Sequence, residues 1–225
     1  MPSGRKRYRG PADLPQSFPV FPLRGAILLP RAQLPLNVFE PRYLEMVEDA
    51  IGGARVLAIV QPATGDGESP PGKSVELRHI GCVGRISAYE ELPDGRLHIS
   101  LAGIARCTLG SEIETPKAYR LFAASFERFM DDFTGSGEVE VDRERLLRVL
   151  EAYLKTRRLQ ADWGALARAP TEWLVNSLAV ASPYGPEEKQ ALLEASDLKA
   201  RADMLVALAE MEMAGGDGGA GTTLQ

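Results

Sequence analysis

The apolar positions of this chain follow two different periods, with a change near residue 130. From Phe18 to Met130, short apolar runs alternate with prolines and glycines, a pattern typical of β-strands separated by turns. Buried strands are predicted at residues 26–29, 56–60, 80–88, 97–105 and 119–126. Residues 18–23 contain two prolines, which cannot donate to a β-ladder, so this segment is predicted to be an edge strand.

A tight turn and one helix interrupt this strand-rich part. The sequence Leu-Pro-Asp-Gly at 92–95 lies between the two longest predicted strands, and its Asp94-Gly95 pair predicts a hairpin turn with positive φ angles. Pro41 suits the first turn of a helix, and the glycine pair at 52–53 suits its end. Between them, apolar residues recur at helical spacing: Leu44, Met46, Val47 and Ile51.

Beyond a turn-rich linker at 131–137, the apolar residues recur with a period of about 3.6, which predicts amphipathic helices. The first helix carries an apolar stripe: Val141, Leu146, Leu147, Val149, Leu150, Tyr153 and Leu154. Further helices are predicted from Trp163, from Thr171 and from Pro186, and Asp197 is the expected N-cap of a last helix at 198–211. The short loops between these helices predict a compact antiparallel bundle.

Together these elements predict an α+β fold. A β-rich part at 18–130 with one inserted helix is followed by a helical bundle at 138–212. The bundle is expected to pack on the β-rich part, because a few short helices bury little surface alone. Residues 1–17 are expected to form a flexible basic tail, and residues 213–225 a flexible glycine-rich tail.

The distribution of charge argues against a groove that binds nucleic acid. The net charge is −5, although the first ten residues carry Arg5, Lys6, Arg7 and Arg9 and no acid. The rest of the chain is therefore more acidic than the total indicates, whereas proteins that bind nucleic acid need clustered Lys and Arg. The basic tail is a candidate contact for nucleic acid or acidic lipid, but a solvated terminus is the simpler interpretation.

No segment predicts export or membrane insertion. The basic N-terminus is not followed by the apolar core of a signal peptide, and no apolar run approaches the roughly 20 residues needed to span a bilayer. Cys82 and Cys107 have no CxxC spacing and no neighbouring His, which predicts two buried free thiols, with a single disulfide as the alternative. The protein is therefore expected to be cytoplasmic.

Motifs for catalysis or cofactor binding are weak. The two histidines, His79 and His98, lie within predicted strands and lack metal-binding spacing. No Gly-x-Ser-x-Gly motif occurs, and the Glu90-Glu91 pair beside the hairpin turn is interpreted as a solvated strand end. We therefore expect no catalytic residue, no bound metal and no cofactor.

Residues 67–74, Gly-Glu-Ser-Pro-Pro-Gly-Lys-Ser, satisfy the Walker A pattern letter for letter. However, Pro70 and Pro71 remove two of the backbone N–H groups that would hold a phosphate. A polar stretch at 62–66 precedes the motif, and a predicted strand follows it where a phosphate-binding loop would open a helix. A loop that binds no nucleotide is therefore predicted.

Three stretches resemble the N-terminal domain of Lon proteases. They are residues 18–30 with 34–36, residues 80–86 with 92–95 and 101–106, and a helical set comprising 181–183, 188–190, 193–194, Asp197 and Arg201. The resemblance covers about residues 18–212 and implies a PUA-like β-barrel followed by a helical bundle. In Lon this domain recognises unfolded or tagged proteins.

The Lon ATPase and Ser-Lys protease domains have no counterpart in this sequence. The resemblance therefore implies a non-catalytic module that binds unfolded or exposed hydrophobic polypeptide segments, or a partner in proteolysis. Two alternatives remain open: an RNA-binding PUA-like module, and a hydrolase or peptidase-associated activity. A likeness of fold cannot choose among them, because function depends on the site.

The segment at 37–43 is the predicted polypeptide-binding surface. Phe39 precedes the start of a helix, and Arg42 and Tyr43 lie in its first turn. In one interpretation Phe39 packs onto the helix as a hydrophobic staple and Arg42 is solvated. In the other, Phe39 and Tyr43 stay partly exposed and hold apolar side chains, while Arg42 binds carbonyl or acidic groups.

Overall fold

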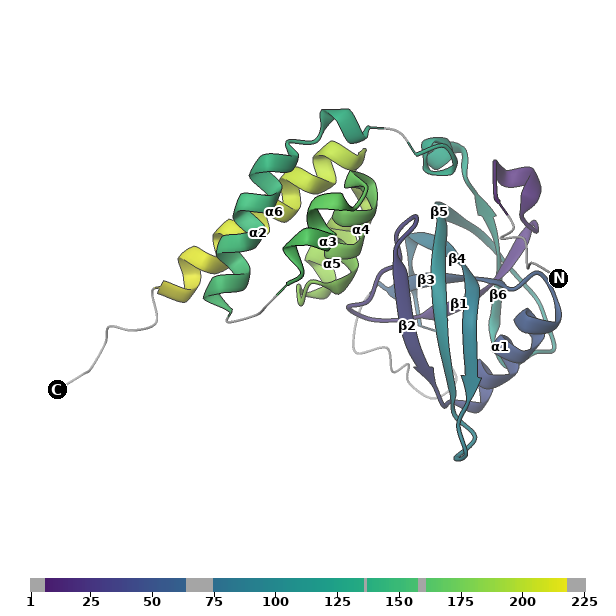
Figure 1. Ribbon diagram of the computed structural model, residues 1–225. Helices are drawn as coiled ribbons and strands as arrows, with labels where there is room; N and C mark the ends of the chain where they lie inside the picture. Colours follow the sequence, from purple (N-terminus) through teal and green to yellow (C-terminus); the bar gives the residue numbers. More distant parts are fainter. Residues whose placement is uncertain (1–6, 64–74, 136, 158–160, 218–225) are drawn as a thin grey trace.

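The structure of the chain is a computed structural model, in which a mixed β-sheet lies beside a group of helices (Figure 1). It describes residues 7–63, 75–135, 137–157 and 161–217. The Walker-like motif at 67–74 lies outside the described residues, as do Arg5 and Lys6 of the basic tail and residues 218–225.

Within the described residues, six strands form one sheet that closes on itself. The strands are β1 (Ser17–Pro22), β2 (Gln33–Val38), β3 (Val56–Pro62), β4 (Leu77–Glu91), β5 (Leu97–Ile113) and β6 (Arg120–Ser125). Their order is β2-β5-β4-β3-β1-β6, and β6 pairs with β5 as well. The first half of β5 pairs with β2 and its second half pairs with β6. Strands β5, β4, β3, β1 and β6 therefore form a closed ring, and β2 lies at its outer edge.

The hairpin predicted at 92–95 joins β4 to β5. The amide of Leu92 donates to the carbonyl of Arg96, and the amide of Gly95 donates to the carbonyl of Leu92, both at 2.9 Å. Gly95 has a φ of +82°, whereas Asp94 is not among the residues with positive φ. The prediction is therefore wrong for Asp94, because this loop is longer than the two-residue turn in which both central residues need positive φ.

The proline-containing strand β1 is not an edge strand, contrary to the prediction. It runs parallel to β3 on one side and antiparallel to β6 on the other. Pro19 lies in the half that pairs with β6, and Pro22 is the last residue paired with β3. Because each half of β1 has mainly one neighbour, a missing N–H on the open side costs no ladder bond. The edge strand is β2, which also contains a proline, Pro35.

Residues 26–29 form a buried loop, not the predicted strand. The turn after them lies against β5, where the amide of Arg31 donates to the carbonyl of Gly103 and the amide of Gly103 donates to the carbonyl of Ala32. A Cβ at position 103 would lie 1.9 Å from the carbonyl oxygen of Leu29, so this close approach requires glycine. The apolar run at 26–29 is buried because the chain lies so close to β5. An apolar run alone does not distinguish a buried loop from a strand, which is why the prediction failed.

The helices predicted from periodicity are confirmed. They are α1 (Pro41–Gly52), α2 (Arg143–Thr156), α3 (Trp163–Arg168), α4 (Thr171–Ala181), α5 (Pro186–Glu194) and α6 (Leu198–Asp217), and short 3-10 helices occur as η1 (Pro11–Asp13), η2 (Glu127–Phe133) and η3 (Glu138–Glu140). The expected N-cap is also confirmed, because the Asp197 carboxylate accepts a hydrogen bond from the amide of Ala200 at 2.7 Å.

Three predicted boundaries change. Part of the predicted flexible tail at 1–17 is structured, because Pro11–Asp13 form η1 and Leu14 is buried. The linker predicted at 131–137 begins inside η2, where Asp132 is buried. The last helix continues past Met211 to Asp217, so the start of the predicted flexible tail at 213–225 is helical. Extending an existing helix adds a hydrogen bond for each residue ordered, so it is far less costly than starting one.

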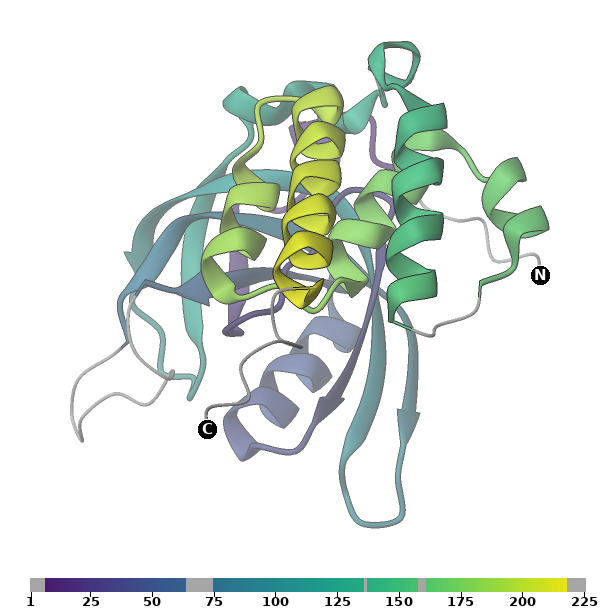
Figure 2. The same cartoon turned by 90° about the vertical axis from the view of Figure 1, so that its left-hand side faces the viewer.

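The C-terminal helices cover one face of the sheet (Figure 2). One hydrophobic cluster joins sheet residues such as Leu57 and Leu101 to helical residues such as Leu174 and Leu192. A second cluster draws most of its residues from the strands of the ring and includes Phe18. The apolar face of the helices is thus buried against the outside of the sheet.

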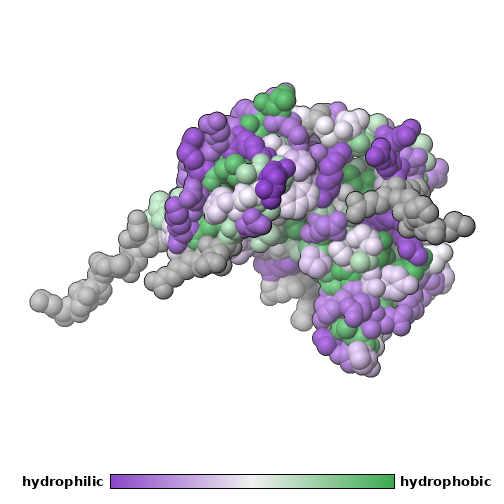
Figure 3. Space-filling view, in the orientation of Figure 1, coloured by the Kyte–Doolittle hydropathy of each residue, from purple (hydrophilic) through white to green (hydrophobic). Residues whose placement is uncertain are grey.

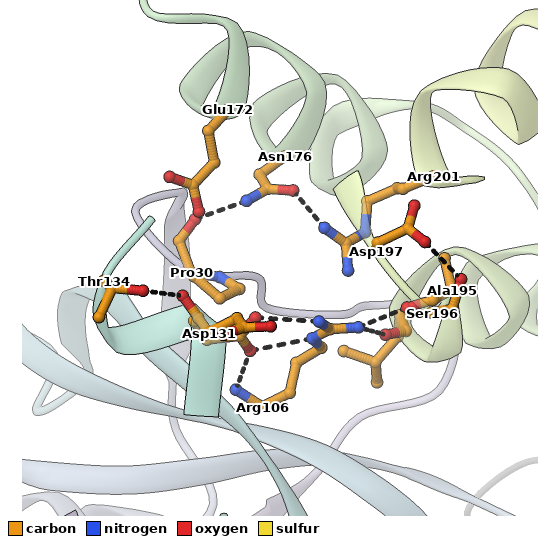
Figure 4. A network of polar contacts seen from close by, with 12 residues as sticks. Pro30, Arg106, Asp131, Thr134, Glu172, Asn176, Ala195, Ser196, Asp197 and Arg201 are labelled. Carbon is orange, nitrogen blue, oxygen red and sulfur yellow. Dashed lines mark hydrogen bonds and ion pairs between the residues drawn. The ribbon is translucent and has the colours of Figure 1, made fainter. Parts of the chain in front are cut away.

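A buried polar network joins the same two parts (Figure 4). Arg106 of β5 pairs with Asp132 of η2 at 2.9 Å, and it donates to two carbonyl oxygens at the end of α5 at 3.2 and 2.6 Å. Arg201 of α6 donates to the side chain of Asn176 at 2.8 Å, and Asn176 donates to the carbonyl of Pro30 at 2.9 Å. Cations at a helix C-terminus are favourable, so the network sets the position of the helices on the sheet.

Candidate functional site

The three residues predicted to bind polypeptide have different surroundings. Phe39 lies between β2 and α1 and is 63% exposed. Arg42 donates from Nε to Glu40 at 3.0 Å, and its guanidinium lies 4.6 Å from the centre of the Tyr43 ring. Tyr43 is buried and stacks on Phe21, with ring centres 4.2 Å apart. Burial raises the pKa of the Tyr43 phenol, and the charge of Arg42 opposes this effect.

Both interpretations of this segment need correction. Tyr43 is only 7% exposed, so the expectation that it stays accessible is wrong. The hydrophobic staple is also wrong, because a Phe39 ring packed onto the helix would not remain largely in solvent. The side chains accessible to a ligand in this segment are those of Phe39 and Arg42, since Tyr43 faces β1.

An apolar groove lies among the C-terminal helices. It has a volume of about 230 Å³ and lies between α2, the end of α4 and α6. Its lining residues are Leu146, Val149, Leu150, Tyr153, Leu154, Leu178, Ala181, Ser182, Pro183, Tyr184, Leu205, Val206 and Ala209. None of them is charged, so the groove suits uncharged side chains. Figure 3 shows hydrophobic surface among hydrophilic residues on this helical part.

Ion pairs hold α2 against α6 beside the groove. Arg145 pairs with Glu210 at 3.2 Å, and Arg157 pairs with Glu212 at 2.6 Å. The hydroxyl of Tyr153 also bonds Glu212, and burial raises the pKa of that phenol. These contacts join two of the helices that line the groove.

The groove was not predicted, although its signal is in the sequence. Five of the seven residues in the predicted stripe of α2 line it. The period of 3.6 identifies an apolar face, but it does not tell whether neighbouring helices cover that face completely. Here the outer stripe residues Leu150 and Leu154 remain only partly buried.

Residues with potential for catalysis or metal binding do not gather at the groove. His79 lies on β4 and His98 on β5, as predicted. In the part of the chain that the structure describes, no group of His, Cys, Asp and Glu could hold a metal ion. Among those same residues, no helix is both long and apolar enough to cross a membrane.

The two cysteines are buried free thiols, as predicted. Cys107 is paired with Gly81 across β4 and β5, so it is one position out of register with Cys82. The two side chains consequently belong to different hydrophobic clusters. Burial raises the pKa of Cys107 to about 12 and holds that of Cys82 well above its ordinary value.

Comparison with known proteins places this chain in a family. The profile of the ATP-dependent protease La (LON) substrate-binding domain matches residues 17–210. The chain belongs to this family. Relatives of this LON substrate-binding chain include the Lon protease of Desulfosudis oleivorans, 25% identical over 191 residues, and Lon protease 2 of Sorangium cellulosum, 29% identical over 217 residues.

The chain matches only a part of these relatives. The alignments cover 84% and 92% of this chain, but 23% of the Desulfosudis protein and 26% of the Sorangium protein. The LON substrate-binding chain thus spans about a quarter of the length of the curated relatives it matches.

Two solved structures share the fold of this LON substrate-binding chain. A Lon N-terminal domain protein from Xanthomonas campestris has a TM-score of 0.57 at 24% identity, covering 85% of this chain and 97% of that one. The N-terminal domain of Mycobacterium avium complex Lon protease has a TM-score of 0.63 at 18% identity, covering 86% of this chain and 98% of that one. At these identities the likeness concerns the fold, which is the predicted α+β class.

Proposed function

We propose that this chain is a non-catalytic module that binds polypeptide segments with exposed hydrophobic side chains. The observation that carries the proposal is the uncharged groove between α2, α4 and α6, in a chain of the LON substrate-binding family. The partner is an unfolded or partly folded protein in the cytoplasm, or a protein that takes part in proteolysis. The closed ring of strands acts as a PUA-like barrel that carries the helices.

The chemistry of the groove favours an apolar side chain over a charged one. Burying a Leu or Phe side chain contributes about 1.5–3 kcal/mol, so a single side chain gives weak and reversible binding. A charged side chain in the same place would lose its hydration without gaining a partner, because no lining residue is charged. Such a groove distinguishes exposed core segments from ordinary protein surface.

The test places a charge in the groove and measures binding of a fluorescently labelled, reduced and carboxymethylated protein. Leu150→Asp introduces a carboxylate at a partly buried lining position, and it is expected to weaken binding at least tenfold. The matched control is Ala152→Asp, which introduces the same charge on an exposed position of α2 outside the groove. Equal binding by both variants, with unchanged circular dichroism, would show that the groove is not the site.

A further inference from the structure

A second, larger cavity lies on another part of the helical layer. It has a volume of about 570 Å³ and shares no lining residue with the groove. Its lining residues are Arg31, Glu138, Ala161, Asp162, Ala165, Leu166, Ala169, Pro170, Glu172 and Trp173. We name it the α3–α4 cavity, because most of these residues belong to those helices and the turn between them.

The walls of the α3–α4 cavity are apolar and small. Ala165, Ala169 and Pro170 leave space beside Trp173, whose side chain is 42% exposed. The chain has two tryptophans, and the other, Trp163, is the first residue of α3 and is 39% exposed. A partly exposed aromatic ring beside an open space offers a flat surface for an aliphatic chain or a cation.

The charges that line the cavity do not balance. Glu138, Asp162 and Glu172 face a single cation, Arg31, which pairs with Glu172 at 2.5 Å. Burial raises the pKa of Glu172, and the guanidinium of Arg31 lowers it, so this pair neutralises itself. The carboxylates of Glu138 and Asp162 therefore carry the unbalanced negative charge.

Both of these carboxylates are held in place by the backbone. Oε1 of Glu138 accepts from the amide of Glu172 at 2.8 Å, and Oδ1 of Asp162 accepts from the amide of Ala165 at 2.9 Å. Of the nearby cations, Arg143 donates to Thr171 and to two carbonyl oxygens of α3, so it is used within the fold. Arg168 does not line the cavity, but its guanidinium lies near Asp162, since a Cβ on Gly164 would contact both side chains. Glu138 is therefore the less compensated of the two carboxylates.

The cation that lines the cavity, Arg31, comes from the turn between β1 and β2. Arg31 has a φ of +63°, which is unfavourable for a residue with a side chain. Its amide donates to the carbonyl of Gly103 on β5, which keeps it in this conformation. The Arg31 guanidinium is paired with Glu172 at 2.5 Å, so it neutralises that carboxylate and not Glu138 or Asp162.

We propose that the α3–α4 cavity binds a lysine or arginine side chain of a polypeptide segment that also carries apolar residues. This inference rests on the proposed function and adds a preference for a basic residue. The aliphatic stem lies along Ala165, Ala169 and Trp173, and the cationic head lies near Glu138 and Asp162. Because the attraction is partly exposed to solvent, it weakens as the salt concentration rises.

The test uses the tryptophans as reporters. Trp163→Phe leaves Trp173 as the sole tryptophan, so its fluorescence reports directly on the cavity. The probes are two capped pentapeptides of sequence Ala-Leu-X-Leu-Ala, in which X is lysine or norleucine. Norleucine has a similar aliphatic chain and lacks the ammonium group. The lysine peptide is expected to bind at least tenfold more tightly at low salt, and equal affinities would overturn the proposal.

Two variants separate the charge of the cavity from the net charge of the protein. Glu138→Gln with Asp162→Asn removes both charges but keeps an oxygen that accepts each backbone hydrogen bond. This variant is expected to lose the preference for lysine. Glu90→Gln with Glu91→Gln removes two charges from exposed positions of β4 and is expected to keep the preference. Equal loss in both variants would contradict a role for the cavity.

Failure of this inference can be told apart from failure of the proposed function. If the lysine peptide leaves Trp173 unchanged while the carboxymethylated protein still binds and Leu150→Asp weakens it, the α3–α4 cavity is overturned and the groove stands. If the intact protein binds neither ligand, both are overturned.

Discussion

Phe39 is the exposed aromatic side chain among the three residues that were predicted to bind polypeptide. It follows the end of β2 and precedes α1, and both of these elements are paired or packed on the sheet. An aromatic ring at such a junction is held by a rigid backbone but packs little itself. Aromatic residues bury much area at low entropic cost when they bind, so we propose Phe39 as a second contact for polypeptide, in addition to the groove.

We predict that Phe39→Ala combined with Arg42→Ala weakens binding of a denatured protein at least tenfold, about 1.4 kcal/mol. The fold should survive, because both side chains are largely exposed. Fluorescence anisotropy with the labelled protein measures the loss, and circular dichroism checks the fold. Ile113→Ala, at an exposed position at the other end of β5, is the control. Normal binding by a folded double variant would place the second contact elsewhere.

The cysteines give a prediction about reactivity. Attack on a thiol reagent requires the thiolate, and burial keeps the pKa of both Cys82 and Cys107 far above neutral pH. We predict slow labelling of both residues by a disulfide reagent in native buffer at pH 8, and fast labelling in denaturant. Mass spectrometry of freshly purified protein without reductant provides the second measurement. An intramolecular disulfide there would contradict the register of β4 and β5.

The helices and strands that could be predicted from the sequence are those whose position depends on a local pattern of residues. Strands β3, β4 and β5 and the helices follow from periodicity and turn residues. Strand β2 was not predicted, because Pro35 interrupts a short run that otherwise reads as a strand. Strand β2 tolerates that proline because it lies at the edge of the sheet. Which strand lies at the edge depends on the arrangement of the whole sheet and cannot be read from a local pattern. Local pattern could not predict the closed ring either, since closure depends on the pairing of β6 with the distant strand β1, and only the family resemblance implied a barrel.

The candidate sites were harder to predict for a similar reason. The stripe of α2 was visible, but the groove exists only where α4 and α6 leave part of that stripe uncovered. The α3–α4 cavity combines Arg31, which belongs to a loop of the sheet, with residues more than a hundred positions later in the chain. Exposure of Phe39 and burial of Tyr43 depend on which side of α1 faces β1, and short apolar segments do not specify this strongly.

Helix α5 contains a buried cation that links stability to pH. Nζ of Lys189 donates to the carbonyl oxygens of Ala179 and Val180, at 2.8 and 2.6 Å, where α4 ends. Burial lowers the pKa of Lys189 to about 8. Between that pH and the ordinary lysine pKa, the unfolded chain holds a proton that the folded protein has released. The free energy of unfolding therefore rises with pH in this window and is flat below it.

We predict that this rise is absent from Lys189→Met, which keeps an unbranched chain as long as the aliphatic stem of lysine and removes the amine. From pH 8 to pH 10, the free energy of unfolding of the wild type should increase relative to the variant by on the order of 1–2 kcal/mol. Urea denaturation at a series of pH values measures the difference, in which the contributions of groups shared by the two proteins cancel. A difference that stays constant or falls with pH would mean that Lys189 remains charged throughout.

The whole molecule depends on the contact between helices and sheet. The hydrophobic cluster between them contains residues of both parts, and the pair Arg106–Asp132 is buried within the same contact. Loss of the helical part would expose the apolar outer face of the sheet to water. It would also leave Arg106 without Asp132, and an unpaired buried charge is strongly destabilising. The sequence predicts the apolar part of this contact from the stripes of the helices, whereas the polar network joins residues too far apart in the chain to be recognised.

We predict that the protein unfolds in a single cooperative transition and that a truncated protein ending at Met130 is poorly soluble. Shared core residues couple the two parts, so neither can unfold while the other keeps its packing. Differential scanning calorimetry should give a calorimetric enthalpy equal to the van't Hoff enthalpy. A protein ending at Asp217, which lacks only residues outside the described structure, serves as the control and should match the full chain. Two separate transitions, or a soluble and folded protein ending at Met130, would instead show that the β-rich part is autonomous. The helices, with both of their cavities, would then fold as a separate unit. Ligand binding would stabilise only the transition in which the helices unfold.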